Sequence, residues 1–176
     1  DRVAGYLPNI PQTIVAMLAT SALGGVWSSC SPDFGIRGVL DRFEQINPKV
    51  LFVADGYFYK GKKIDLTSNI LEIQSSLSSL KETICINIVN AKKNSQVSYW
   101  DDIPKNEGKI NFEPVTFSHP LYIMYSSGTT GKPKSIVHSA GGTLIQHLKE
   151  LKYHVNLNKN DKIFYYTTCG WMMWNW

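Results

Sequence analysis

The chain has 176 residues, of which 43% are hydrophobic and 18% are charged, and this composition excludes an intrinsically disordered protein and allows one domain with a substantial core. The net charge of +4 is small and no block of five or six basic residues occurs, so nucleic acid is not expected as a partner. No apolar run approaches the length that spans a bilayer, so membrane insertion is not expected either.

The cysteines and the ends of the chain bear on its origin. Cys30, Cys85 and Cys169 are far apart and odd in number, without a CxxC pair or a zinc-ligand spacing. Unpaired thiols of this kind are typical of a reducing compartment, and we expect the cytosol. The chain lacks an initiator Met, begins directly before a predicted strand and stops inside an aromatic run, which predicts an internal fragment of a longer protein.

Apolar runs alternate with segments of helical periodicity along most of the chain. The runs predict strands over residues 3–7, 26–30, 50–54, 83–89, 121–125, 134–138 and 162–168. The periodic segments predict helices over residues 11–23, 36–46 and 69–80, and another that follows Gly141-Gly142 and ends near residue 153. Residues 90–119 are polar and irregular and predict a long connection. Strands alternating with helices, and the fully apolar run 50–54, indicate an α/β fold with a mostly parallel sheet.

The most informative stretch is residues 125–134, YSSGTTGKPK, directly after an apolar strand pattern. Its composition suits phosphate, because glycines let backbone N–H groups approach a ligand, hydroxyls add donors and lysine adds a mobile charge. A Walker P-loop is excluded, since Ser126 stands where its first Gly is required and Pro133 follows Lys132 in place of Ser or Thr. Pro133 also disfavours direct entry into a helix, and the β-branched residues that follow predict a returning strand. We therefore predict a hairpin loop over a nucleotide.

The order of residues 126–134 resembles the phosphate-loop signature of the adenylate-forming enzymes, which include acyl-CoA synthetases, luciferases and peptide-synthetase adenylation domains. A surface turn rich in Gly, Ser and Thr is the alternative, but the ordered match between two strand patterns disfavours it. The resemblance covers nearly the whole chain and is weakest from residue 57 to residue 112. Similarity to the amino-terminal large domain of short-chain acyl-CoA synthetases is found in residues 1–9, 16–19, 24–25 and 31–35. Similarity to the branch that activates acetoacetate is strongest in residues 31–43, 137–150 and 167–176.

The resemblance implies a reaction and a set of phosphate-binding residues. Such enzymes join a carboxylate to ATP, release pyrophosphate and transfer the acyl group from AMP to coenzyme A. Preorganised donors are needed where charge spreads over the phosphate oxygens. The implied phosphate-binding residues are Ser126, Ser127, Gly128, Thr129, Thr130, Gly131 and Lys134. Among them, Thr129 and Thr130 are expected as catalytic hydroxyl donors and Lys134 as a catalytic cation. Mg²⁺ would share the charge, and no carboxylate of this chain is assigned as its ligand.

The aromatic run at residues 170–176, GWMMWNW, is the second informative stretch. Trp and Met fill protein interiors well, so a core segment is one interpretation. The other is an acyl pocket walled by Gly170, Trp171, Trp174 and Asn175, placed after a strand end where open α/β sheets bind ligands. Acetyl-specific relatives carry a His or Gly in part of this segment, so the run departs from them and fits the acetoacetate branch. Asn175 could donate a hydrogen bond to a 3-keto oxygen.

The densest basic cluster is residues 59–63, YKGKK. A solvated loop is the simplest interpretation. By resemblance, however, the cluster occupies the place where acetyl-CoA synthetases carry arginines that contact the coenzyme A nucleotide. Lys60 and Lys62 are therefore candidates for binding the 3′-phosphate of coenzyme A.

The resemblance as a whole implies that residues 1–176 are part of the amino-terminal AMP-binding domain of an acyl-CoA synthetase. The predicted function is that of an acetoacetate–CoA ligase whose small-molecule substrates are ATP, acetoacetate and coenzyme A. The adenine and ribose contacts and a carboxy-terminal lid domain with a catalytic Lys would lie beyond this fragment, so the piece alone is expected to be inactive. The alternatives are a CoA ligase for acetate, propionate or butyrate, and a non-catalytic nucleotide-binding fragment.

Overall fold

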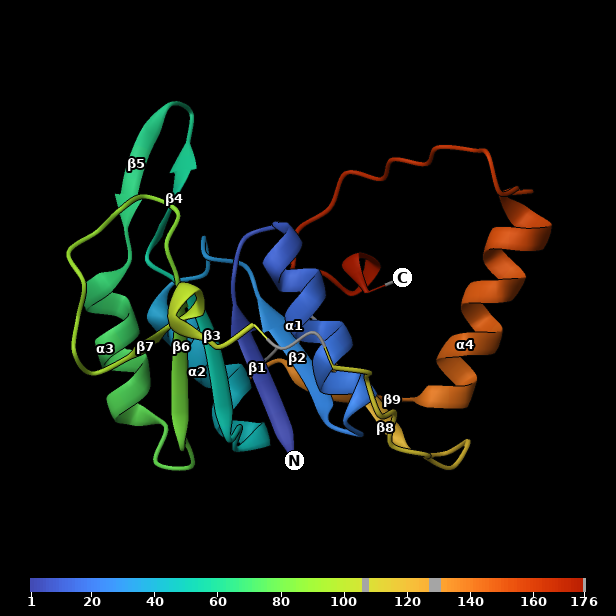
Figure 1. Ribbon diagram of the computed structural model, residues 1–176, viewed down its shortest axis with the longest axis horizontal. Coiled ribbons are helices and arrows are strands. Elements are labelled where there is room, and N and C mark those ends of the chain that lie inside the picture. Colours follow the sequence, from blue (N-terminus) through green and yellow to red (C-terminus); the bar gives the residue numbers. More distant parts are fainter. Residues whose placement is uncertain (106–107, 127–130, 176) are drawn as a thin grey trace.

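A seven-stranded sheet forms the centre of the molecule, with the strand order β7-β6-β3-β1-β2-β8-β9 (Figure 1). The structure is a computed structural model that describes residues 1–105, 108–126 and 131–175. Neighbouring strands of this sheet are parallel, except that β8 and β9 form an antiparallel hairpin. The predicted α/β fold with a mostly parallel sheet is thus confirmed. The strands are β1 (Arg2–Tyr6), β2 (Val26–Cys30), β3 (Val50–Ala54), β6 (Glu82–Ile86), β7 (Ser98–Tyr99), β8 (Pro120–Ser126) and β9 (Lys134–Ser139).

Helices cover both faces of the sheet and create two hydrophobic clusters. Helix α1 (Pro11–Ala22) packs on one face, where Ala16 meets the buried side chains of β2 and β8. Helices α2 (Ile36–Ile46) and α3 (Thr67–Ser76) pack on the opposite face (Figure 1). Because both faces are covered, the central strands are apolar on both sides, which explains the fully apolar pattern of β3.

Helix α2 spans the residues that the periodicity predicts. Val39, Phe43 and Ile46 recur at helical spacing and are buried against the sheet. The helix ends at Asn47, which adopts the left-handed conformation with φ of 47° and donates its backbone N–H to the carbonyl of Phe43 at 3.1 Å. Pro48 follows and prevents further helix, so this boundary is set by local chemistry.

Asp55 determines where β6 ends, three residues before the predicted boundary at residue 89. Its buried carboxylate accepts hydrogen bonds from the backbone N–H groups of Ile88, Val89 and Ala91 at 2.7, 3.0 and 2.9 Å. Those donors are therefore satisfied by a side chain and do not extend the ladder with β3. The strand closes at Ile86.

A second sheet forms over residues 56–65, where the sequence predicted no strand and where the basic cluster was interpreted most simply as a solvated loop. Strands β4 (Gly56–Tyr59) and β5 (Lys62–Asp65) pair as an antiparallel hairpin. Lys60 and Gly61 both have positive φ at its two-residue turn, as a tight hairpin turn requires.

Helix α3 then begins at Thr67, earlier than predicted, because the carboxylate of Asp65 accepts the Thr67 N–H at 2.7 Å. The hydrogen bonds from Thr67 also lower the pKa of Asp65.

The carboxy-terminal part of the described chain departs most from the prediction. Helix α4 (Ala140–Lys149) begins before the two glycines, and a side-chain hydrogen bond from Gly142 N–H to Ser139 caps it. A Cβ at Gly141 would lie 2.1 Å from the Phe117 ring, so the glycine allows the preceding segment to pack on the first turn. The helix continues as a wider turn over Glu150–His154. Residues 162–168, predicted as a strand, have no regular structure, and Phe164 and Tyr166 are exposed.

The remaining irregular segments carry short elements. The predicted long connection over residues 90–119 contains β7, which pairs with β6, and a 3-10 helix over Trp100–Asp102. A second 3-10 helix over Met172–Trp174 brings the end of the chain back against α1 (Figure 1). No helix among the described residues is both long and apolar enough to cross a membrane.

Candidate functional site

The predicted phosphate-binding stretch connects β8 and β9. Ser126 is the last residue of β8 and lies opposite Lys134, the first residue of β9, in the antiparallel register. The predicted returning strand and hairpin are therefore confirmed. Gly131 and Lys134 are exposed and Ser126 is half-buried. Ser127, Gly128, Thr129 and Thr130 lie outside the described residues, and their roles stay predictions.

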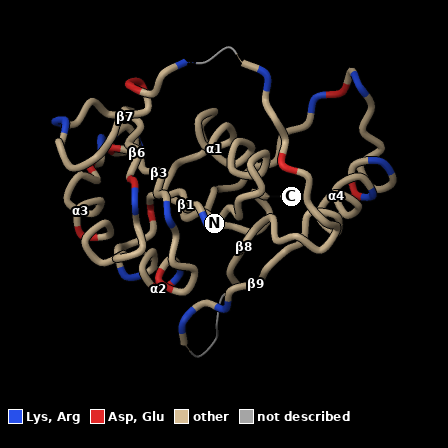
Figure 2. Tube along the Cα trace, turned by 60° about the horizontal axis from the view of Figure 1, so that its bottom comes forward, with Lys and Arg blue, Asp and Glu red and all other residues tan. Residues whose placement is uncertain are grey.

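The two lysines of the stretch have different surroundings. The Lys132 ammonium lies 3.7 Å from a carboxylate oxygen of Asp41 and 3.5 Å from one of Glu44, both on α2. Lys134 has no carboxylate within ion-pair distance in the part of the chain that the structure describes. Basic residues gather where β9 begins, next to α2 (Figure 2). Lys134 is thus the cation that remains available to an anionic ligand.

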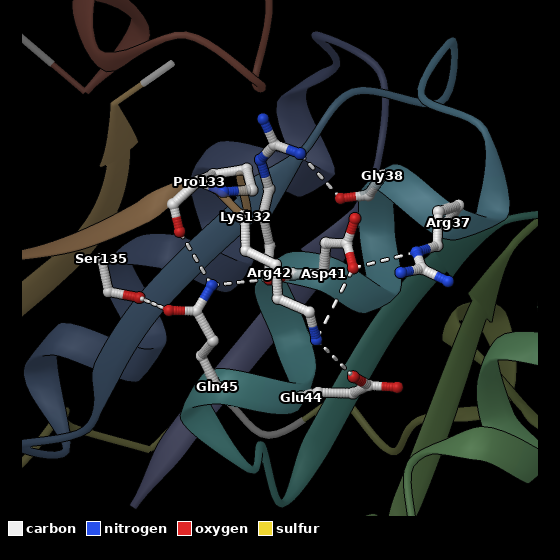
Figure 3. A network of polar contacts seen from close by, with 9 residues as sticks. All are labelled: Arg37, Gly38, Asp41, Arg42, Glu44, Gln45, Lys132, Pro133 and Ser135. Atoms are coloured by element: carbon white, nitrogen blue, oxygen red, sulfur yellow. Dashed lines mark hydrogen bonds and ion pairs between the residues drawn. The ribbon is translucent and has the colours of Figure 1, made fainter. Parts of the chain in front are cut away.

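Gln45 of α2 binds the chain on both sides of Lys134 (Figure 3). Its amide nitrogen donates to the carbonyl oxygen of Pro133 at 2.9 Å, and its amide oxygen accepts from the Ser135 hydroxyl at 2.9 Å. The same amide nitrogen donates within α2 to the carbonyl oxygen of Asp41 at 2.6 Å. Helix α2 therefore holds the segment that enters β9 through two residues at once.

Beneath the hairpin, Tyr125 is tied to β2 and α2. Its hydroxyl donates to the carbonyl oxygen of Arg42 at 3.1 Å and lies 3.4 Å from the Ser28 hydroxyl. Burial raises the pKa of Tyr125, so the group is a neutral hydrogen-bonding phenol and not a base. The guanidinium of Arg42 lies 4.7 Å from the ring centroid of Phe34 and 5.6 Å from that of Tyr125, which fixes its position between two aromatic rings.

The loop after β2 is held by a buried tyrosine. The Tyr6 hydroxyl lies 2.9 Å from the carbonyl oxygens of both Pro32 and Phe34. Burial raises the pKa of Tyr6 to about 12, so this hydroxyl keeps its proton as a donor. These two hydrogen bonds hold Pro32 and Phe34 in place, and Phe34 is the residue of this loop that lies against Gly170 of the aromatic run.

The aromatic run returns to the carboxyl edge of β2. The Ser29 hydroxyl donates to the carbonyl oxygen of Cys169 at 2.8 Å. A Cβ at Gly170 would lie 2.7 Å from the Phe34 ring, so only glycine fits this close approach. After the neighbouring strands β1 and β2 the chain continues to opposite faces of the sheet, to α1 after β1 and to α2 after β2. Open α/β sheets bind ligands at such a switch point.

The predicted acyl-pocket residues fall into two groups. Gly170, Trp171 and Asn175 line one pocket with Ser29 and Tyr125, and the volume of this pocket is about 10 Å³. Trp174 lines a different cavity of about 590 Å³ and donates its indole N–H to the side-chain oxygen of Asn9 at 3.0 Å. The structure thus brings three of the four residues next to the end of β8. Trp171 is largely exposed, so the alternative of a fully buried core segment does not describe it.

Lys60 and Lys62 lie on the β4–β5 hairpin, which projects from the sheet (Figure 1). The hairpin follows β3, whose carboxyl end lies at the same edge as that of β8 because the intervening strands are parallel. The Lys60 ammonium lies 5.4 Å from the ring centroid of Tyr59. Both lysines are exposed, and the pairing of β4 with β5 makes the cluster part of an antiparallel hairpin and not an irregular loop.

The described residues offer no cluster of three or more His, Cys, Asp or Glu side chains that could hold a metal ion. Asp41 and Glu44, the carboxylates next to the hairpin, are already paired with Lys132. A magnesium ion held by Asp41 and Glu44 does not fit that arrangement. Mg²⁺ commonly binds through substrate phosphates and keeps several waters.

Sequence reasoning missed Gln45, Arg42 and Asp55. Gln45 is exposed on α2 and has no motif of its own, and its partner Pro133 lies 88 positions later. For Arg42 the sequence shows only a charged residue on a helix and no motif that indicates a contact with Phe34 or Tyr125. An acidic residue directly after a buried strand was the one available indication for Asp55. The three cysteines are free, as expected, and they are also buried, which raises the pKa of each thiol to about 12.

The parallel sheet covered on both faces, with a Gly- and Ser-rich hairpin at its carboxyl edge, defines a nucleotide-binding domain of the adenylate-forming type. A model of the family described as AMP-binding enzyme matches residues 1–175, and the chain belongs to this family.

Curated relatives of this chain include proteins named acetoacetyl-CoA synthetase. The acetoacetyl-coenzyme A synthetase of Rhizobium meliloti (strain 1021) is 51% identical over 183 residues, which cover 100% of this chain and 28% of that protein. The acetoacetyl-CoA synthetase of Gallus gallus is 50% identical over 187 residues with the same coverage. The solved structure of acetoacetyl-CoA synthetase from Streptomyces lividans superposes with a TM-score of 0.96 at 50% identity, over 99% of this chain and 27% of that one. The chain thus spans little more than a quarter of the length of these relatives.

Proposed function

We propose that this chain is part of an acetoacetate–CoA ligase. The reaction joins acetoacetate to ATP, releases pyrophosphate and transfers the acyl group from AMP to coenzyme A. The observation that carries the proposal is that relatives named acetoacetyl-CoA synthetase are about half identical along the entire chain. The hairpin and the aromatic run, which we assign to ATP and to the acid, meet at the same edge of the sheet.

We assign the β8–β9 connection to the β- and γ-phosphates. Ser126, Ser127, Gly128 and Gly131 would donate through backbone and hydroxyl groups, and Thr129 and Thr130 would act as the catalytic hydroxyl donors. Lys134, which is free of carboxylate partners among the described residues, would neutralise charge on the leaving pyrophosphate. Mg²⁺ would arrive with the nucleotide and share that charge.

We assign the acid to the edge between Gly170, Trp171, Trp174 and Asn175. The packing of Gly170 on Phe34 and of Cys169 on Ser29 supports a wall fixed to β2. Asn175 would donate a hydrogen bond to the 3-keto oxygen, which butyrate lacks. Asn175→Ala is therefore expected to reduce the preference for acetoacetate over butyrate by about tenfold. Full retention of the preference in steady-state kinetics would exclude this role.

The β4–β5 turn would bind the nucleotide part of coenzyme A. Lys60 and Lys62 are exposed on an antiparallel hairpin at the carboxyl edge, which supports a contact with the 3′-phosphate. Double charge reversal, Lys60→Glu with Lys62→Glu, should raise the KM for coenzyme A by about tenfold without changing pyrophosphate exchange. A KM for coenzyme A that stays at the wild-type value would leave the cluster as a solvated turn.

Residues 1–176 would form part of the amino-terminal AMP-binding domain, with small molecules as partners and the cytosol as the location. The deciding experiment is carboxylate-dependent formation of AMP and pyrophosphate by the full-length protein. Acetate, propionate, butyrate, acetoacetate and 3-hydroxybutyrate are each supplied with ATP and coenzyme A. A preference for acetoacetate supports the proposal, and a preference for another acid changes the substrate. No activity with any acid would leave a nucleotide-binding protein without catalysis.

A further inference from the structure

Gln45 occupies an unusual position relative to the hairpin. We define the returning arm as residues 132–135, the segment that leads from the predicted phosphate loop into β9. The Gln45 amide donates to the carbonyl just before Lys134 and accepts from the hydroxyl just after it (Figure 3). One planar side chain therefore holds the backbone of Pro133 and the side chain of Ser135, on either side of Lys134. The Lys134 ammonium has no carboxylate partner among the described residues.

The support behind Gln45 is rigid. Its helical neighbours Phe43 and Ile46 are buried against the sheet, with exposed fractions of 0% and 5%. The amide is oriented further by its hydrogen bond to the carbonyl of Asp41 at 2.6 Å. The returning arm is thus attached to a helix whose apolar face is buried in the core, and not merely to its partner strand.

Lys132 contributes a second attachment. Its ammonium lies between Asp41 and Glu44, and Arg37 shares the Asp41 carboxylate at 3.1 Å (Figure 3). These exposed ion pairs are individually weak, but they direct Lys132 toward α2. One lysine of the returning arm therefore serves as an anchor, while the other keeps its full charge for a ligand.

We propose that Gln45 is a positioning residue that sets the Lys134 ammonium for the β- and γ-phosphates of ATP. The inference rests on the proposed function only in assigning ATP phosphates to this hairpin. Fixing the backbone around Lys134 before binding reduces the entropy lost when the ammonium contacts the nucleotide. The contribution is specific to the phosphates that Lys134 reaches, so it is absent for AMP.

The test measures binding of ATP with Mg²⁺, and separately of AMP, to the full-length protein by isothermal titration calorimetry without any acid. Gln45→Leu removes both contacts to the returning arm at similar volume and should raise the Kd for ATP by about five- to tenfold. The Kd for AMP should stay unchanged. Ser135→Ala removes one of the two contacts and should raise the Kd for ATP by about two- to threefold. Gln12→Leu on α1 makes the same chemical change where no side-chain hydrogen bond is present among the described residues, and should alter neither Kd.

A double-mutant cycle separates positioning from general stability. In a Lys134→Ala background, Gln45→Leu should add no further loss of ATP affinity, because the effect passes through the lysine. Equal losses for ATP and AMP, additive losses in the cycle, or an unchanged ATP Kd would each overturn the inference. A wild-type protein that binds ATP but activates no acid would refute the proposed function and still give a decisive result for Gln45. A wild-type protein that binds no ATP would refute both.

Discussion

The sheet with α1, α2 and α3 differs sharply from the segment of residues 140–175, although both show apolar helical periodicity. In α2 the periodic residues Val39 and Phe43 are completely buried. In α4 the corresponding apolar residues Leu144, Ile145 and Leu148 are 58–59% exposed. Residues 162–168 are also apolar and aromatic, and Phe164 is 87% exposed. Apolar periodicity thus predicts a helix wherever it occurs, but burial also requires a neighbouring element.

The β8–β9 hairpin and the aromatic run are both attached to the sheet with α1, α2 and α3. Contacts of the returning arm are made to α2, whose own position is fixed by the core. The aromatic run contacts β2 and the loop after it through Ser29 and Phe34. Site residues are held in a precise position only where the side chains around them are fixed by packing. The sheet with α1, α2 and α3 therefore positions the candidate site.

The largest effect should come from emptying the core beneath α2. Phe43→Ala should destabilise the protein by about 3–5 kcal/mol, because a fully buried aromatic side chain leaves a cavity. Leu148→Ala on α4 should change stability by no more than about 0.5 kcal/mol, since that side chain is mostly exposed. Urea unfolding of residues 1–176, as the unchanged chain and as each variant, followed by circular dichroism, compares the two. Similar losses at both positions would show that the face of α4 is buried in the native protein.

Asp55 provides the next largest effect. Asp55→Ala leaves three buried or half-buried backbone N–H groups without their acceptor, and should destabilise the protein by about 2–3 kcal/mol. Asp65→Ala removes a single exposed acceptor at the start of α3 and should cost about 1 kcal/mol. Thermal unfolding of both variants gives the ranking. A larger loss for Asp65→Ala would contradict the role assigned to the buried carboxylate.

Gly170→Ala tests the contact between the two regions. The new methyl group would overlap the Phe34 ring at 2.7 Å, and overpacking of this kind costs about 1–3 kcal/mol. If the aromatic run walls the acyl site, the KM for the acid should rise while the Kd for ATP stays unchanged. Gly35→Ala, where a Cβ meets no atom within 4 Å, is the matched control. An unaltered KM for the acid in Gly170→Ala would separate this segment from the acid.

The smallest effect concerns pH and α4. Desolvation lowers the pKa of His147 from its ordinary value of 6.5, because burial disfavours the charged imidazolium. The unfolded chain then binds a proton more readily than the folded one, so stability should increase as pH rises from the folded pKa to about 6.5. His147→Gln should flatten this dependence. Unfolding midpoints between pH 5 and pH 8 measure it, and an identical slope in the variant would exclude His147 as the cause.

Much of the fold could be predicted because its signals are local. The boundaries of β2, α2 and β3 were predicted to the residue, since Gly24-Gly25 precede β2 and Asn47-Pro48 separate the periodic helix α2 from the apolar run of β3. The hairpin over residues 126–134 was predicted because Pro133 disfavours a helix and β-branched residues follow it. The family could be recognised because its signature residues are contiguous in the chain.

Other features could not be predicted, because they depend on which surfaces meet. The pattern of residues 162–168 is typical of a strand, but a strand needs a partner, and these residues pair with none of the described strands. The β4–β5 hairpin was missed because its side chains are charged and its stability comes from a two-residue turn.

The sequence by itself determined most strands and helices of the sheet region, its mostly parallel order and the hairpin of β8 and β9, because these follow from periodicity and turn chemistry over a few residues. Only the tertiary structure decided that Gln45 binds both sides of Lys134, that Lys132 is an anchor and that Gly170 lies on Phe34. Gln45 and Pro133 are 88 positions apart in the chain, and so are Glu44 and Lys132. Such contacts follow from how α2 and the loops pack on the common sheet, which no local pattern records.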